Sequence, residues 1–149
     1  MFIYIGSDHA GFELKKQLIN YYNKNNCNYF IDCGCYNTQS VDYPDIAASV
    51  AEKVVQDNSS NINSIGILIC GTGIGMSISA NKFKNIRAAL IYDINTAEMA
   101  KLHNNSNVIC LGARKLDFDL AVVLINKFLD TEFEGGRHEK RLKKIEFNL

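Results

Sequence analysis

Residues 67–83, ILICGTGIGMSISANKF, place a cysteine at the end of an apolar run and a glycine-rich segment directly after it. A cysteine thiolate can act as a base or a nucleophile. The backbone N–H groups of a glycine-rich turn can converge on an anion, and the positive end of a following helix strengthens their effect. Cys70, Gly71, Gly73 and Gly75 therefore form a candidate site for thiol chemistry or anion binding. A tight turn beside a buried cysteine is the structural alternative.

The spacing of this segment excludes two common phosphate-binding loops. A P-loop needs Gly-Lys at positions 76 and 77, where Met76 and Ser77 stand, and a phosphatase-like C-x5-R loop needs arginine at position 76. The dinucleotide fingerprint also fails at Met76, although Asp93 follows about 20 residues later, where a ribose-binding acid would lie. A nucleotide-binding site is weakened by this mismatch but stays open.

Two further segments carry groups suited to acid/base chemistry or sugar binding. In GSDHAGF (6–12), Asp8 and His9 follow the first apolar run, and Asp8 either orients a hydroxyl group or only caps the next helix. In KLHNNSN (101–107), His103 and Asn104 end a helical segment. A histidine there can also simply complement the helix dipole, and an asparagine can form a turn.

The C-terminal segment RHEKRLKK is basic and has helical periodicity. Arg137 and Arg141 lie four residues apart on one helical face, with His138 beside them. Guanidinium groups bind phosphate through paired, charge-assisted hydrogen bonds, whereas a solvated basic helix is the commoner role of such a segment. Two glycines precede it and would let it reach a neighbouring subunit, so that phosphate binds across a dimer interface.

Short apolar runs typical of buried strands alternate with longer amphipathic segments. Each predicted strand is followed by a predicted helix, which gives five β-α units. Such a pattern favours a parallel sheet covered on both faces, with ligands at the carboxyl ends of the strands. We therefore expect a three-layer α/β/α sandwich with a five-stranded, Rossmann-like sheet. The predicted strands are 2–6, 29–33, 65–70, 86–92 and 107–112, and the helices are near 14–22, 43–56, from about 75, 95–104 and 117–130.

The chain has 149 residues, of which 47% are hydrophobic and 21% charged, and its formal net charge is zero. We expect one domain over residues 1–149, with residues 135–149 as a C-terminal helical arm. The neutral charge and the short apolar runs argue against nucleic-acid and membrane partners and, without a signal peptide pattern, favour a cytoplasmic protein. No C-x-x-C pair occurs, so we expect reduced thiols at Cys27, Cys33, Cys35, Cys70 and Cys110.

Six segments together resemble one protein family. GSDHAGFELK at the start, DYP at 42–44, ICGTGIGMSISANK, HNNSNV at 103–108, LGAR at 111–114 and EGGRHEKR at 134–141 are similar to ribose-5-phosphate isomerase B. The wider family also includes galactose-6-phosphate isomerase subunits. The resemblance implies a three-layer fold, a dimer, and isomerisation of a sugar phosphate without a metal or another cofactor.

The resemblance also assigns roles to individual residues. Cys70 matches the base that moves a proton between C2 and C1 of the open-chain sugar, and His103 matches the residue that opens the ring. One branch of the family uses a glutamate at the position of Met76, so this chain resembles the branch that uses cysteine. The anion hole around the enediolate corresponds to Gly71, Thr72, Gly73, Ile74 and Gly75, with Thr72 as a proton relay. Sugar-binding positions correspond to Asp8, Tyr43 and Asn104, and phosphate-binding positions to His9, Arg114, Arg137, His138 and Arg141.

The expected reaction is the interconversion of ribose 5-phosphate and ribulose 5-phosphate, a step of the pentose phosphate pathway, through ring opening and a cis-enediolate. Because Cys70, His103 and both arginines occur in one chain, we expect a homodimer, or a dimer of dimers, with shared active sites. One alternative substrate is a six-carbon sugar phosphate, such as galactose 6-phosphate or allose 6-phosphate. The alternative from another class is a non-catalytic nucleotide-binding module built on the glycine loop and Asp93.

Overall fold

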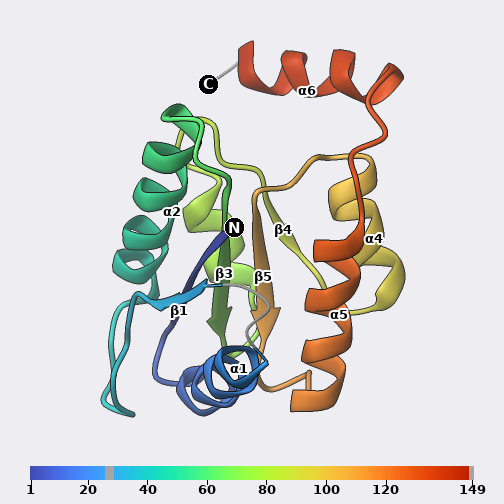
Figure 1. Ribbon diagram of the computed structural model, residues 1–149. Helices are drawn as coiled ribbons and strands as arrows, with labels where there is room; N and C mark the ends of the chain where they lie inside the picture. The colour runs from blue at the N-terminus through green and yellow to red at the C-terminus, as the bar shows by residue number, and fades with distance from the viewer. Residues whose placement is uncertain (26–28, 148–149) are drawn as a thin grey trace.

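The computed structural model describes residues 1–25 and 29–147, which form a parallel five-stranded sheet and six helices. The strands lie in the order β2-β1-β3-β5-β4, so the chain crosses over between non-adjacent strands (Figure 1). Register pairs Ile5 with Ile67 and Cys70 with Gly112. All carboxyl ends of the strands therefore point to one edge of the sheet. The strands are β1 (Phe2–Ser7), β2 (Tyr29–Asp32), β3 (Ser64–Cys70), β4 (Ala88–Leu90) and β5 (Val108–Gly112).

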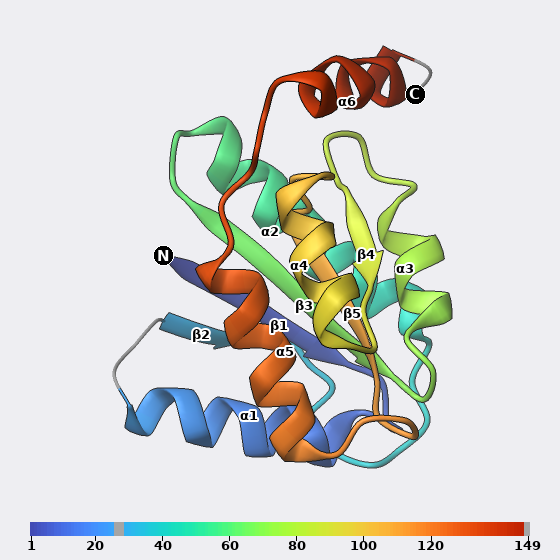
Figure 2. The same cartoon turned by 90° about the vertical axis from the view of Figure 1, so that its right-hand side faces the viewer.

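Helices cover both faces of the sheet, as the alternating pattern predicted (Figure 2). One face carries α1 (Phe12–Lys24), α4 (Ile94–Leu102) and α5 (Phe118–Asp130), and the other carries α2 (Tyr43–Ser59) and α3 (Ile74–Ala80). The last helix, α6 (Arg137–Phe147), stands apart from both layers at the amino ends of the strands. The three-layer α/β/α prediction is confirmed.

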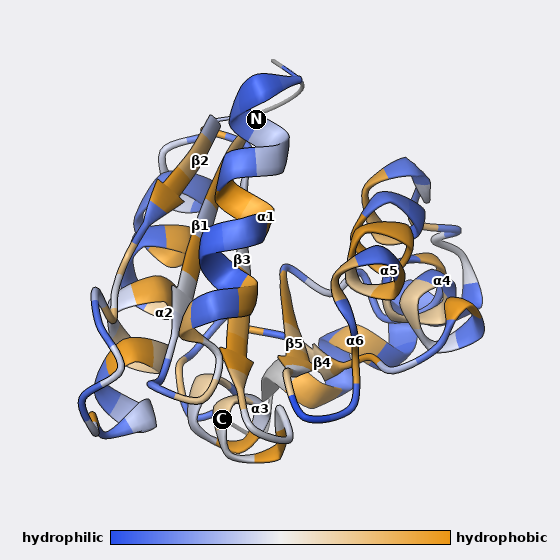
Figure 3. Ribbon diagram, turned by 90° about the horizontal axis from the view of Figure 1, so that it is seen from below, coloured by the Kyte–Doolittle hydropathy of each residue, from blue (hydrophilic) through white to orange (hydrophobic). Residues whose placement is uncertain are grey.

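The core divides at the sheet because side chains along a strand alternate between its faces. In β3, Ile67 and Ile69 pack with α1, α4 and α5, whereas Leu68 and Cys70 pack with α2 and α3. Figure 3, which is seen from the edge where the strands end, shows the apolar strands between the helices. β3 and β5 are buried along their whole lengths, so the central strands fix the positions of the loops that follow them.

Some boundaries differ from the sequence-based expectation. The fourth strand is shorter than the predicted 86–92, because Ile86 forms a turn with Phe83 and Arg87 bonds to the side chain of Asn107. Pro44 occupies the first turn of α2, as expected. The structure describes α6 up to Phe147, so the end of the predicted arm lies outside the described residues, as does Cys27. Within the described residues, every helix is too short or too polar to span a membrane.

Candidate active site

Cys70 is the last residue of β3 and lies at the carboxyl edge of the sheet, which we call the thiol edge. Its side chain is 5% exposed, and its sulfur accepts a hydrogen bond from the backbone N–H of Gly73 at 3.0 Å. A donor at this distance stabilises negative charge on sulfur. Cys110 lies on the neighbouring strand, where complete burial, reinforced by the charge of Cys70, raises the pKa of its thiol. Cys70 is thus the better placed of these two thiols to take up and release a proton.

The glycine loop after Cys70 leaves no room for side chains at the positions that bend. Gly73 has φ +78°, a left-handed conformation, and a Cβ there would lie 2.5 Å from Leu90 Cδ1. A Cβ on Gly75 would lie 2.8 Å from the ring of Tyr43. The turn therefore depends on glycine, and it holds the Gly73 N–H against the sulfur.

Residues predicted to bind sugar and phosphate surround this loop at the thiol edge. Tyr43 begins α2 and covers Gly75, and the side chain of Arg114 lies over Gly71. The Arg114 N–H donates to the Gly71 carbonyl at 3.0 Å, which joins the loops after β3 and β5. Thr72 and Ile74 are exposed beside them. The structure therefore brings these residues to the same edge as Cys70.

Asp8 and His9 complete the thiol edge, directly after β1. The Asp8 N–H donates to the Ile69 carbonyl at 3.0 Å. Because Ser7 pairs with Ile69, the next residues of the two chains, Asp8 and Cys70, lie side by side. The Asp8 carboxylate accepts hydrogen bonds from the N–H groups of Ala10 and Gly11. These bonds fix the carboxylate in a turn that precedes α1. The capping alternative is wrong, because the N-cap of α1 is Gly11 and this helix has no side-chain cap. His9 is exposed, with its Nδ1 3.5 Å from the Val41 N–H.

His103 lies at the opposite edge of the sheet, which we call the histidine edge. It ends α4, which runs back from the carboxyl end of β4 toward the start of β5. A strand rises about 3.3 Å per residue, so β3 alone spans roughly 20 Å between the two edges. Within one chain, the structure does not bring His103 and Asn104 together with Cys70.

His103 belongs to a compact cluster with His138 and Glu134. The two imidazole rings stack at 4.1 Å between centroids, and each Nε2 lies 3.6 Å from Glu134 Oε2. Burial, followed by the positive charges of His103, Arg137 and Arg141, lowers the pKa of His138, while Glu134 opposes them. Arg137 Nε donates to His138 Nε2 at 3.2 Å. The neutral form of His138 is thus favoured, with a lone pair on Nε2.

The same cluster has the donor atoms of a metal site but unfavourable surroundings for a cation. The ligand atoms of His103, Glu134 and His138 lie within 4.8 Å of one another. However, Arg137 occupies the lone pair of His138, and the guanidinium group of Arg141 adds positive charge. These surroundings suit an anion such as phosphate better than a metal ion.

Arg137 and Arg141 lie on α6, as predicted, and both are exposed. Gly135 and Gly136 have φ values of +71° and +55° and turn the chain into this helix. Leu142 on α6 is buried, at 7% exposure, near Asn104. The helix therefore covers the histidine edge of its own sheet, and its arginines join His103, Asn104 and His138 at that edge.

Sequence reasoning missed Glu134 and Lys15. Lys15 is completely buried in α1 and forms an ion pair with Asp32, and its Nζ donates to the Cys35 carbonyl at 2.6 Å. A lysine in an amphipathic helix is ordinarily solvated, so only its place on the apolar face, three residues before Leu18 and seven before Tyr22, marked it. The position of Asp93, by contrast, is explained by the cap of α4, because its carboxylate accepts from the Thr96 N–H at 2.7 Å.

Comparison with known proteins agrees with this arrangement. Residues 3–145 match the family described as Ribose/Galactose Isomerase. A relative from Rickettsia bellii, a sugar phosphate isomerase by name, is 51% identical over 144 residues, which cover 97% of this chain and 96% of the relative.

Solved structures of similar proteins share the whole fold. Ribose-5-phosphate isomerase B from Clostridium thermocellum is 42% identical, with a TM-score of 0.92 over 99% of this chain and 97% of that chain. Ribose-5-phosphate isomerase B from Mycoplasma genitalium, solved with bound ribulose 5-phosphate, is 40% identical, with a TM-score of 0.91 over 99% and 95% of the two chains.

The fold, the thiol at the sheet edge and the family match define a sugar phosphate isomerase of the α/β class. More particularly, the chain belongs to the ribose/galactose isomerase family. The resemblance inferred from the six sequence segments is thus confirmed.

Proposed function

We propose that this protein interconverts ribose 5-phosphate and ribulose 5-phosphate in the cytoplasm, as part of the pentose phosphate pathway. The observation that carries the proposal is the Cys70 sulfur, held at 3.0 Å from a backbone N–H at the end of β3 and followed by a glycine loop. This arrangement provides a base and an anion-stabilising turn within a few residues. The solved structure of a relative with bound ribulose 5-phosphate supports the choice of substrate.

The reaction needs three groups in turn. His103 transfers a proton between the ring oxygen and the C1 hydroxyl group and so opens the furanose ring. The Cys70 thiolate then removes the proton on C2, and the electron pair moves to the carbonyl oxygen to give a cis-enediolate. Backbone N–H groups of the glycine loop stabilise that oxygen charge. Cys70 returns the proton to C1, and Thr72 relays a proton between O1 and O2, which completes the ketose.

The phosphate is held away from the reacting carbons by cationic side chains. Arg137 and Arg141 are positioned for this role by α6, and His138 lies buried beside them. At the thiol edge, His9 and Arg114 approach the sugar phosphate from the other side. Binding energy from the remote phosphate then orients C1 and C2 against Cys70.

The active site is completed by two copies of the chain. Cys70 and His103 lie at opposite edges of one sheet, whereas the chemistry requires both at one sugar. A dimer with two-fold symmetry that apposes the thiol edge of one copy to the histidine edge of the other forms two complete sites. Every group needed is present in this chain, so a homodimer suffices, and a dimer of dimers preserves the same pairing.

An assay of isomerisation tests the proposed substrate. The purified protein is incubated with ribose 5-phosphate, and ketose formation is followed, with galactose 6-phosphate and allose 6-phosphate as parallel substrates. We expect the highest kcat/KM for ribose 5-phosphate. Preferential turnover of a hexose phosphate would contradict the pentose assignment, and saturable nucleotide binding without any turnover would contradict the isomerase assignment.

A further inference from the structure

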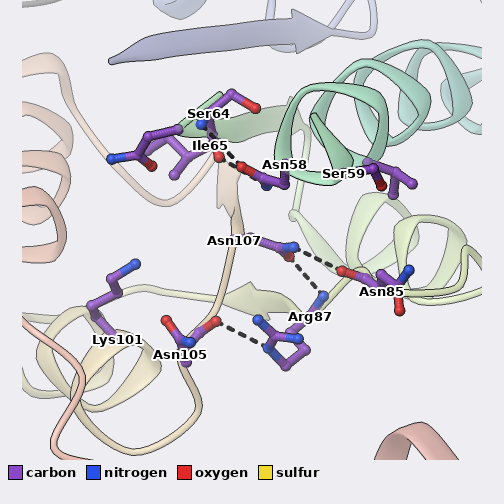
Figure 4. A pocket seen from close by; sticks show the side chains of 11 residues that line it. Asn58, Ser59, Ser64, Ile65, Asn85, Arg87, Lys101, Asn105 and Asn107 are labelled. Carbon is purple, nitrogen blue, oxygen red and sulfur yellow. Dashed lines mark hydrogen bonds between the residues drawn. The ribbon is translucent and has the colours of Figure 1, made fainter. Parts of the chain in front are cut away.

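A cavity of about 370 Å³ lies at the amino ends of the strands, between the end of α2 and the end of α4. We call it the asparagine cavity, after Asn58, Asn63, Asn85, Asn105 and Asn107 in its wall. All of these except Asn63 are labelled in Figure 4. Its volume falls in the range of about 300–1,000 Å³ that is usual for small-molecule sites. Neither Arg137 nor Arg141 lines it, so it is distinct from the proposed substrate site.

Among the residues that the structure describes, the ionisable side chains that line this cavity are all cationic. They are Arg87, which precedes β4, and Lys101, in the last turn of α4. No carboxylate of residues 1–25 and 29–147 forms an ion pair with Lys101, whose Nζ lies 5.6 Å from the centroid of the Phe128 ring. Burial, followed by the charge of Arg87, lowers the pKa of Lys101. An anion bound in the cavity would stabilise the charged form of Lys101 and would so oppose both the burial and the repulsion from Arg87.

The wall of the cavity is held in place before any ligand binds. Arg87 Nε donates to the Asn105 carbonyl at 3.0 Å, and the Arg87 N–H donates to Asn107 Oδ1 at 2.8 Å. Asn107 Nδ2 donates in turn to the Asn85 carbonyl at 2.7 Å, as the dashed lines in Figure 4 show. Preorganised polar groups bind a ligand with little loss of conformational entropy.

Several polar groups of the wall are available for hydrogen bonds. In the described part of the chain, the side-chain amides of Asn63, Asn85 and Asn105 form no hydrogen bond with another residue. Each amide offers both a donor and an acceptor, which is the pattern that hydroxyl groups require. The cavity is also larger than a phosphate group alone, so its ligand carries polar atoms besides the anion.

We propose that the asparagine cavity is a second binding site, for a small phosphorylated polyhydroxy compound. The phosphate lies between Lys101 and Arg87, and the hydroxyl groups bond to the amides. Because Arg87 also holds the Asn105 carbonyl, the site is joined to the loop that follows His103.

Equilibrium dialysis of the full chain with radiolabelled ribose 5-phosphate tests this proposal. The Cys70→Ser background slows turnover, and we expect two molecules of sugar phosphate, aldose and ketose counted together, bound per chain. Adding Lys101→Met should reduce this number to one, whereas Lys101→Arg, which retains the charge, should keep two. Lys24→Met removes an exposed positive charge at the end of α1 and serves as the matched control, with two molecules bound.

A fourth variant, Arg141→Ala, distinguishes the two binding sites. At a ligand concentration that just saturates the background protein, Arg141→Ala should lower the number bound to about one molecule, at the asparagine cavity, because it weakens the substrate site about 10- to 100-fold. If Lys101→Met still binds two molecules, the second site does not exist. If Lys101→Met lowers the number to one but Arg141→Ala leaves it at two, the second site stands and the role of Arg141 in the proposed function is wrong.

Discussion

At the scale of single residues, the proposed isomerase chemistry depends on Cys70. Its sulfur is nearly buried and accepts a hydrogen bond from the backbone N–H of Gly73. A weaker base at this position should therefore lower the rate of proton transfer. A general base contributes about 10²- to 10⁴-fold to the rate. Cys70→Ser should lower kcat by this factor and leave the melting temperature within a few degrees. Cys33→Ser, at a half-buried cysteine after β2 that has no role in the proposed reaction, is the matched control and should retain full activity.

In the proposed reaction Arg141 binds the phosphate, which does not react. Hydrogen bonds to charged groups contribute about 1.5–3 kcal/mol, so Arg141→Ala should raise KM about 10- to 100-fold and change kcat little. Lys140→Ala removes an adjacent exposed charge from the same helix and should leave KM unchanged. Steady-state kinetics with ribose 5-phosphate measures both variants, and an equal increase of KM in both would show a general charge effect instead of a specific contact.

His138 makes stability depend on pH. Its pKa lies below the ordinary value of 6.5, chiefly because of burial. As the pH falls below 6.5, the unfolded chain takes up a proton that the folded chain resists, so the free energy of unfolding decreases. We expect His138→Asn to flatten this decrease between pH 6.5 and 5, as measured by urea unfolding. A slope identical to that of the unmodified protein would exclude His138 as its source.

At the scale of the elements, a buried ion pair ties the strand ends of the thiol edge together. Lys15 from α1 pairs with Asp32 at the end of β2 and bonds to the Cys35 carbonyl. The Cys35 N–H donates in turn to the Ser7 carbonyl at 2.7 Å, directly before Asp8. The pair therefore supports the backbone that carries the catalytic edge.

The two residues of this ion pair should contribute unequally to the free energy of unfolding. Asp32→Asn leaves the completely buried Lys15 charge without a counterion, which costs about 3–5 kcal/mol of unfolding free energy. Lys15→Met leaves an Asp32 side chain that is 35% exposed and remains hydrated, so its cost should be smaller. Lys16→Met, an exposed neighbour, should change stability by less than about 0.5 kcal/mol. Urea unfolding ranks the three variants, and a larger loss for Lys15→Met than for Asp32→Asn would contradict this account.

The helices and strands were predictable because apolar residues form short continuous runs in buried strands but recur every three to four residues in amphipathic helices. The end of β3 was predictable from Cys70 and the glycines that follow it. The position of His103 at the far edge was also encoded, because it falls between the end of a helix and the start of a strand. Its contacts with Glu134 and His138 were not predictable, since they join segments about 30 residues apart through a turn at two glycines. The contacts of Lys15 were not predictable for the same reason, because only the tertiary fold brings Asp32 and Cys35 next to it.

At the scale of the whole molecule, the proposed dimer makes the thiol edge of one copy and the histidine edge of the other into one site. The parallel sheet places them at opposite ends, and α6 extends the histidine edge beyond the two layers (Figure 1). A monomer therefore holds every catalytic group without a complete site. Dissociation of the proposed dimer should abolish activity even where each chain stays folded.

Complementation between two inactive variants tests this central claim most directly. Cys70→Ser and His103→Asn should each have at most about 1% of the unmodified activity as homodimers, because every site lacks one group. In a mixed dimer, one site joins the intact Cys70 of one chain to the intact His103 of the other. Co-refolding equal amounts should restore about a quarter of the unmodified activity, because half of the random dimers are mixed and each has one complete site. A co-refolded mixture of dimers without activity would contradict a site shared between two chains.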